Sequence, residues 1–152
     1  MENEKTIDVL NTLITINNDR IEGYETASKE KEEHDLKTMF AQFSATSLEC
    51  KAELTNEVIK LGGTPVEGTM VSGKFFRVWM DVKAALTGKD RKAILNSCEY
   101  GEDAAQDTYK NALENDVEHL TAEQQTMVKA QHLLLKADHD KVKFMRDAVT
   151  AE

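Results

Sequence analysis

The sequence predicts an all-α protein, a four-helix bundle, on three observations. Apolar residues recur at steps of three and four along four long stretches, which is the periodicity of amphipathic helices. The composition favours helices over sheet, because aliphatic and charged residues are abundant and Pro65 is the single proline. Only one connection, GGTPVEGTMVSG (residues 62–73), has the composition of a long loop. The 152 residues suffice for a hydrophobic core, and we expect a single domain over residues 1–152.

The first two predicted helices form a hairpin. The first runs to about Lys29. Its seam, the line of residues expected to face the other helices, consists of Ile7, Leu10, Ile14, Asn17, Ile21 and Tyr24. A charged link, KEKEEHD, separates it from a second seam, which is Leu36, Phe40, Phe43, Ser47, Cys50, Leu54, Val58 and Leu61. Gly62 and Gly63 end this helix, because glycine readily adopts the left-handed conformation found after helix C-termini.

The connection that follows contains a predicted short helix. Its apolar side is Phe75, Trp79, Val82 and Leu86, and we expect Trp79 to pack on the bundle. The sequence TGKD breaks this helix before the second hairpin begins.

The last two predicted helices form the second hairpin. The third long helix covers about Asp90 to Asn115, and a short link, DVEHL, follows it. Thr121 and Gln124 have the spacing of a capping box at the start of the fourth helix. The inward positions of this helix are Met127, Gln131, Leu134, Leu135, Asp138, Val142 and Met145.

The long link between the hairpins allows two connectivities. Residues 62–89 can cross the length of a bundle, so the second and third long helices can run parallel, which is the ferritin-like arrangement with one long crossover. Simple up-and-down order is the alternative, and the loop by itself excludes neither.

Polar residues occupy the centres of the four apolar stripes. At 100° per residue the inward positions include Asn17, Ser47, Glu102, Gln131 and Asp138, with Lys51, Glu99 and His139 at the stripe edges. We expect these groups to meet near the middle of the bundle. Burying them costs several kcal/mol unless they are paired.

Three explanations of this polar layer are open. The first is a hydrogen-bond network of Asn17, Ser47, Lys51, Glu102, Gln131 and Asp138, in which Lys51 neutralises a carboxylate. The second is a divalent metal ion, iron, manganese or zinc, held by Glu99, Glu102, Asp138 and His139. The third is a loosely packed, hydrated interior.

A complete di-iron site is not expected. Di-iron bundles of the ferritin type use a Glu from each of two helices and a Glu-x-x-His from each of the other two. None of the four histidines, at positions 34, 119, 132 and 139, has a glutamate three residues before it. The sequence also has no glycine-rich phosphate loop, no C-x-x-C and no nucleophilic serine motif, so we identify no catalytic residues.

Charge and composition bear on partners and location. A formal net charge of -9 without a basic stripe argues against nucleic acid and anionic membranes as partners. No signal peptide and no run of about 20 apolar residues is visible. Cys50 and Cys98 lie on apolar helix faces, so we expect buried, reduced thiols and a cytoplasmic protein.

Three segments resemble a known family. They are NNDRIEGYETA, VSGKFFRVWMDVKAALTGKDRKAILNSCEYGEDAA and KADHDKVKFMRDA, and the middle one is the most specific. Together they resemble a bacterial four-helix-bundle family of unknown function in the ferritin-like superfamily. The resemblance implies the ferritin-like bundle and a bacterial cytoplasmic setting, but it supplies no reaction. The di-iron ligands of the superfamily cannot be carried over, because Glu102 and His139 do not form its motif.

Two functions follow as predictions. The favoured one is a non-catalytic bundle, associated with stress, that acts through protein contacts or as a homo-oligomer. The alternative is a metal-binding ferritin-like protein with a non-standard carboxylate and histidine site in mid-bundle.

Overall fold

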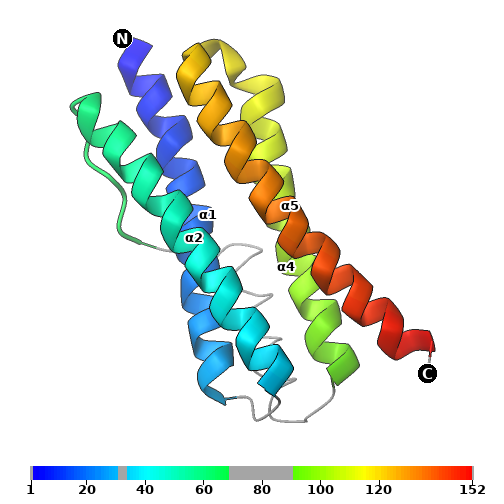
Figure 1. Ribbon diagram of the computed structural model, residues 1–152. Helices are drawn as coiled ribbons and strands as arrows, with labels where there is room; N and C mark the ends of the chain where they lie inside the picture. The colour runs from blue at the N-terminus through cyan, green and yellow to red at the C-terminus, as the bar shows by residue number, and fades with distance from the viewer. Residues whose placement is uncertain (1, 31–33, 69–90, 152) are drawn as a thin grey trace.

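Four long helices pack side by side in the computed structural model, which describes residues 2–30, 34–68 and 91–151 (Figure 1). The helices are α1 (Glu2–Glu30), α2 (His34–Lys60), α4 (Arg91–Asn115) and α5 (Ala122–Ala151), with a 3-10 turn, η1 (Val117–His119), before α5. The most extensive contacts are between α1 and α2 and between α4 and α5, so each predicted hairpin is present. The all-α bundle predicted from the sequence is confirmed.

The two hairpins are joined so that α2 and α4 run in the same direction (Figure 1). Arg91 at the start of α4 forms an ion pair with Asp35 at the start of α2, with 2.6 Å between Nη2 and Oδ2. At the other end of the bundle, Gln124 at the start of α5 donates to Glu57 near the end of α2. The parallel course with a long crossover is therefore the arrangement present, and simple up-and-down order is wrong.

The beginning of the crossover lies along α1. Asn11 donates to the carbonyl of Thr64 and accepts from the amide of Val66, and Asn18 donates to the carbonyl of Gly68. The predicted short helix with Phe75, Trp79, Val82 and Leu86 lies outside the described residues.

Local signals explain where the helices end. Gly62 has φ of +82°, and the amides of Gly62 and Gly63 donate to the carbonyls of Ile59 and Val58. This is the Schellman pattern, which satisfies the last carbonyls of a helix. At α5, the Thr121 hydroxyl accepts from the Gln124 amide while the Gln124 side chain accepts from the Thr121 amide, so the predicted capping box is confirmed.

The apolar core is divided into two clusters by a polar layer. One cluster, toward the N-terminal end of α1, includes Leu10, Leu54 and Val128. The other includes Tyr24, Phe40, Cys98 and Val142. The polar groups between them are the candidate functional site.

Candidate functional site

Arg20 lies at the centre of the bundle and is fully buried. It follows Leu10, Leu13 and Asn17 on the face of α1 that points to the other helices, at steps of three and four residues. The sequence interpretation placed Ile21 in the seam and missed Arg20. Ile21 is only half-buried, because the repeat passes through position 20 and then through Tyr24.

The Arg20 guanidinium binds both carboxylate oxygens of Glu102. Its Nε donates to Oε2 at 2.9 Å and its Nη2 to Oε1 at 2.8 Å. The same Nη2 donates to Oδ2 of Asp138 at 3.0 Å, and Nη1 donates to the hydroxyl of Ser47 at 2.5 Å. Side chains from four helices therefore meet at one cation. The two parallel hydrogen bonds between the guanidinium and the Glu102 carboxylate are the strong, bidentate form of a charge-assisted hydrogen bond.

Aromatic rings cover the guanidinium on the side of the second apolar cluster. Its central carbon lies 5.4 Å from the ring centroid of Tyr24 and 5.8 Å from that of Phe43. A cation over an aromatic face is attracted by the negative face of the ring, and the attraction grows when water is excluded. Arg20 thus has both ionic and aromatic partners in a dry environment.

The pKa values of the layer reflect competition between burial and charge. Burial lowers the pKa of Arg20, but Glu102 leads the interactions that outweigh it and keep the guanidinium charged. For Asp138, burial raises the pKa to about 6 despite the attraction of Arg20. Asp138 therefore takes up a proton as the pH falls through about 6.

A second, uncharged layer lies toward the N-terminal end of α1. Asn17 donates to the hydroxyl of Tyr109 at 2.8 Å, and that hydroxyl donates to Gln131 Oε1 at 2.7 Å. Gln131 Nε2 donates in turn to the Cys50 carbonyl and to Glu53. The hydroxyl of Tyr109 therefore connects α1 to α5.

The predicted network is therefore present in altered form. Asn17, Ser47, Glu102 and Gln131 are buried and Asp138 is half-buried, but they divide between the two layers. The prediction that Lys51 neutralises a carboxylate is wrong. Arg20 occupies both oxygens of Glu102, and no hydrogen bond or ion pair joins Lys51 to the layer within the described part of the chain.

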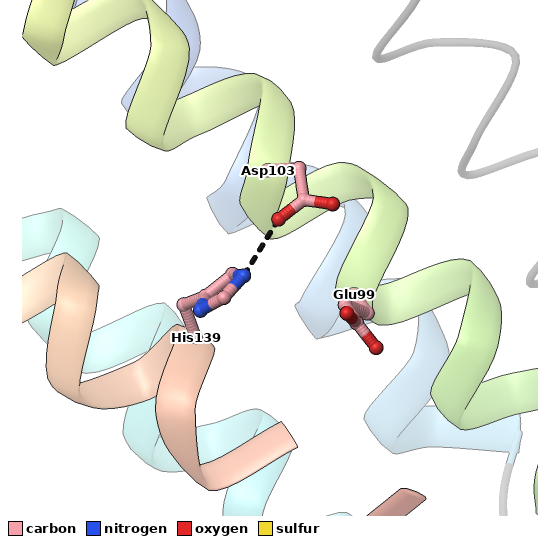
Figure 2. Close-up of side chains that lie close together, drawn as sticks. All are labelled: Glu99, Asp103 and His139. Carbon is pink, nitrogen blue, oxygen red and sulfur yellow. Dashed lines mark hydrogen bonds and ion pairs between the residues drawn. The ribbon is translucent and has the colours of Figure 1, made fainter. Parts of the chain in front are cut away.

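The predicted metal ligands do not form one set. Glu102 and Asp138 bind Arg20 inside the bundle. Glu99 and His139 lie instead at the seam between α4 and α5, together with Asp103 (Figure 2). His139 Nε2 is 2.6 Å from Asp103 Oδ1, and Arg146 forms an ion pair with Glu99.

The carboxylates inside the bundle do not fit a di-metal centre. A guanidinium, which carries a fixed positive charge, stands between Glu102 and Asp138 and binds the oxygens that would coordinate the ions. Among the described residues of this layer no histidine supplies a nitrogen ligand. The layer is therefore suited to fixing the register of the four helices.

The two cysteines are free and buried, on α2 and α4 respectively, as predicted. Burial raises the pKa of the Cys50 thiol to about 12 and that of Cys98 well above its usual range. A thiolate is the nucleophilic form of cysteine, so neither residue is suited to covalent catalysis.

We expect both thiols of the native protein to react slowly with a soluble disulfide reagent at neutral pH. Reaction requires local opening of the bundle, whereas both thiols should react at once in denaturant. Absorbance of the released thiolate measures the two rates. Rapid labelling of one thiol under native conditions would contradict its structural role.

Fold and site together define the class of this protein. It is a four-helix bundle with one long crossover, held at its centre by a buried arginine and two carboxylates. The chain belongs to the family described as Domain of unknown function (DUF2383), which matches residues 5–115. No curated protein matches the chain. None of the described helices is long and apolar enough to span a membrane.

Proposed function

We propose that this protein is a non-catalytic bundle that acts through protein contacts and associates with a second copy of itself through the outer face of α5. The single observation that carries the proposal is the exposure of two large apolar side chains, Leu133 at 67% and Phe144 at 75%. They are 11 residues apart, which is close to three full turns, so they share one face of the helix.

This face also carries small apolar residues, and two exposed charged residues, Asp140 and Lys141, interrupt it between Ala137 and Phe144. Ala137 lies between Leu133 and Phe144 and is exposed, and the half-exposed Leu134 and the exposed Ala130 border them. Single exposed apolar residues are ordinary on a protein surface, but a stripe along one helix is typical of an interaction site. We call this surface, residues 130, 133, 134, 137 and 144, the α5 stripe.

Charged rows on both sides of the α5 stripe favour a second copy as its partner. One side carries exposed lysines of α5 at seven-residue spacing, Lys129, Lys136 and Lys143. On the other side lies α2, since Gln42 accepts from Lys141 and Glu53 accepts from Gln131. The α2 row facing that side is Glu49, Glu53 and Glu57.

These rows also select the geometry of the pair. A two-fold axis along α5 sets the lysine row of each copy against the glutamate row of the other and brings Leu133 to Leu133 and Phe144 to Phe144. A two-fold axis across the helix sets lysines against lysines. We therefore propose a parallel pairing, in which apolar burial supplies affinity and the charged rows set orientation.

Sedimentation equilibrium of the tag-free protein tests this proposal. We expect a concentration-dependent dimer, and we expect L133E/F144E to raise its dissociation constant at least about 100-fold. Burying each of these side chains contributes about 1.5–3 kcal/mol, and 1.4 kcal/mol corresponds to a factor of ten.

The chain offers a matched control. Leu48 and Ile59 are also large, exposed and 11 residues apart, but they lie on α2. L48E/I59E should leave the dissociation constant unchanged. A wild-type protein that stays monomeric near 100 µM, about the weak end of specific association, would contradict self-association. Equal losses in both double variants would contradict the α5 stripe.

The proposal also covers the cellular location of the protein and the superfamily to which it belongs. Two free, buried cysteines support a cytoplasmic setting, where thiols stay reduced. The parallel course of α2 and α4 supports placement in the ferritin-like superfamily (Figure 1). Association with stress is part of the proposal and is tested by comparing protein levels in stressed and unstressed cells.

A further inference from the structure

We propose that Glu99, Asp103 and His139 form a binding site for one divalent transition-metal ion, on the outer seam between α4 and α5. Each residue offers one ligand atom, and the three atoms all lie within 4.8 Å of one another (Figure 2). The site lies apart from both the buried Arg20 layer and the α5 stripe. Its existence therefore does not depend on self-association.

Helix geometry brings these donors together. Glu99 and Asp103 are four residues apart on α4, so they lie one turn apart on the same face. His139 reaches this face from α5, and its Nε2 is 2.6 Å from Asp103 Oδ1 (Figure 2). Two ligands of a tetrahedral zinc ion lie about 3.3 Å apart when each is about 2.0 Å from the metal. Asp103 is exposed and Glu99 and His139 are half-buried, so binding requires rotation of these side chains to that spacing.

The other nitrogen of His139 has the partner that a metal-binding histidine needs. Nδ1 lies 3.2 Å from Oδ1 of Asp140. A carboxylate that accepts from Nδ1 leaves the lone pair of Nε2 directed at Asp103 and Glu99. Such outer carboxylates recur in metal sites, where they orient the ring and increase its basicity.

Charge at the site also favours a cation. Three carboxylates, Glu99, Asp103 and Asp140, surround His139, and two cations pair with them, Arg146 with Glu99 and Lys136 with Asp140. Arg146 contacts Asp147 as well, through Nη2 at 2.8 Å and Nε at 3.2 Å. The guanidinium can therefore stay paired with Asp147 when an ion takes its place at Glu99.

The donor types narrow the class of metal. One imidazole nitrogen and two carboxylate oxygens suit zinc, iron or manganese better than calcium or magnesium, which take oxygen ligands. Three protein ligands leave at least one coordination position for water. Zinc is the appropriate probe, because it has no redox chemistry and no strong geometric preference.

Isothermal titration of the tag-free wild-type protein with zinc chloride tests the site. We expect one ion per chain, and we expect H139A and D103N each to weaken binding more than about 100-fold. The loss should exceed that of D140N, because replacing an outer partner of a metal ligand costs roughly 10–100-fold and removing a ligand costs more. No binding by the wild-type protein at zinc concentrations up to about 1 mM, an affinity of about -4 kcal/mol, would overturn the proposal.

His132 supplies the matched control. It lies seven residues before His139 on α5 and is also half-buried, but the charges nearest to it are Lys110 and Lys136, and its ring stacks on Tyr109. H132A should bind zinc as the wild type does. If H132A and H139A lose affinity equally, binding is distributed over histidines and the assigned site is wrong.

Replacing Arg146 distinguishes a metal site from an ordinary ion-pair cluster, because the two predict different changes in zinc affinity. R146Q removes the cation that competes for Glu99, so it should strengthen zinc binding several-fold while leaving the ligands in place. A cluster with only a structural role predicts no gain. Unchanged or weaker binding by R146Q would overturn the placement of the ion beside Glu99.

Discussion

We expect R20M to destabilise the protein by about 3–5 kcal/mol, the range measured when one partner of a buried ion pair is removed. Methionine fills much of the same volume but leaves Glu102, which is 1% exposed, without its counter-ion. Asp138 and Ser47 lose their partner at the same time. Urea denaturation monitored by circular dichroism measures the loss from the shift in midpoint.

Variants of Glu102 test whether this loss of stability comes from an uncompensated charge. E102L alone should also be strongly destabilising, because it leaves Arg20 fully buried with only the half-buried Asp138 as its ionic partner. The double variant R20M/E102L replaces the ion pair with apolar side chains, and it should be more stable than either single variant. A double variant with the summed loss of the two single variants would contradict this account.

The pH dependence of R20M follows from the same charges. In the folded variant Asp138 lacks the attraction of Arg20, so burial raises its pKa further above that of the unfolded chain. Such a group favours the folded state when protonated, and this contribution disappears as the pH rises through the folded pKa. For Asp138 the wild-type value is already about 6. The deficit of R20M relative to the wild type should therefore be smaller at pH 5 than at pH 7.5.

The bundle could be predicted from the sequence because the apolar periodicity is strong and the end signals are local. Gly62 and the Thr121–Gln124 pair each act through backbone groups within a few residues. The direction of α4 relative to α2 could not be settled, because it depends on contacts between distant segments such as Arg91 and Asp35.

The buried cation was missed for a physical reason. A seam is identified from apolar residues, and at the relevant turn of α1 that criterion selects Ile21 over Arg20. The stricter signal was the alternation of three- and four-residue steps through Leu13, Asn17, Arg20 and Tyr24. An inward Glu102 also required a cation, and the facing helix α1 offered one.

The predicted metal ligands lie in two different places for a related reason. Glu99 and Glu102 differ by three residues, or about 60° around α4, which is enough to direct Glu102 into the core and Glu99 to the seam. Asp103, four residues after Glu99, shares its face and was not recognised. Angles of this size lie within the error of assigning helix faces from a pattern, so only the structure distinguishes the two groups.

Y109F should destabilise the protein by about 1–3 kcal/mol, the cost of leaving buried polar groups without a partner. The hydroxyl is the group to which Asn17 donates and from which Gln131 accepts, and both amides are fully buried. Asn17 keeps the carbonyl of Leu13 as an acceptor, so the unpaired oxygen of Gln131 carries most of the cost. Urea denaturation of the variant and the wild type at pH 7 measures the difference.

Two further variants show whether this cost belongs to the hydrogen bonds or to packing. Y100F removes a hydroxyl from the same helix at a residue that is 49% exposed, and it should change stability by less than about 0.5 kcal/mol. Y109F/Q131M removes both polar partners and should lose less than the sum of Y109F and Q131M, because no Gln131 oxygen then remains unpaired. Additive losses would instead mean that Tyr109 and Gln131 stabilise the bundle independently, and the hydroxyl would then not be the group that connects α1 to α5.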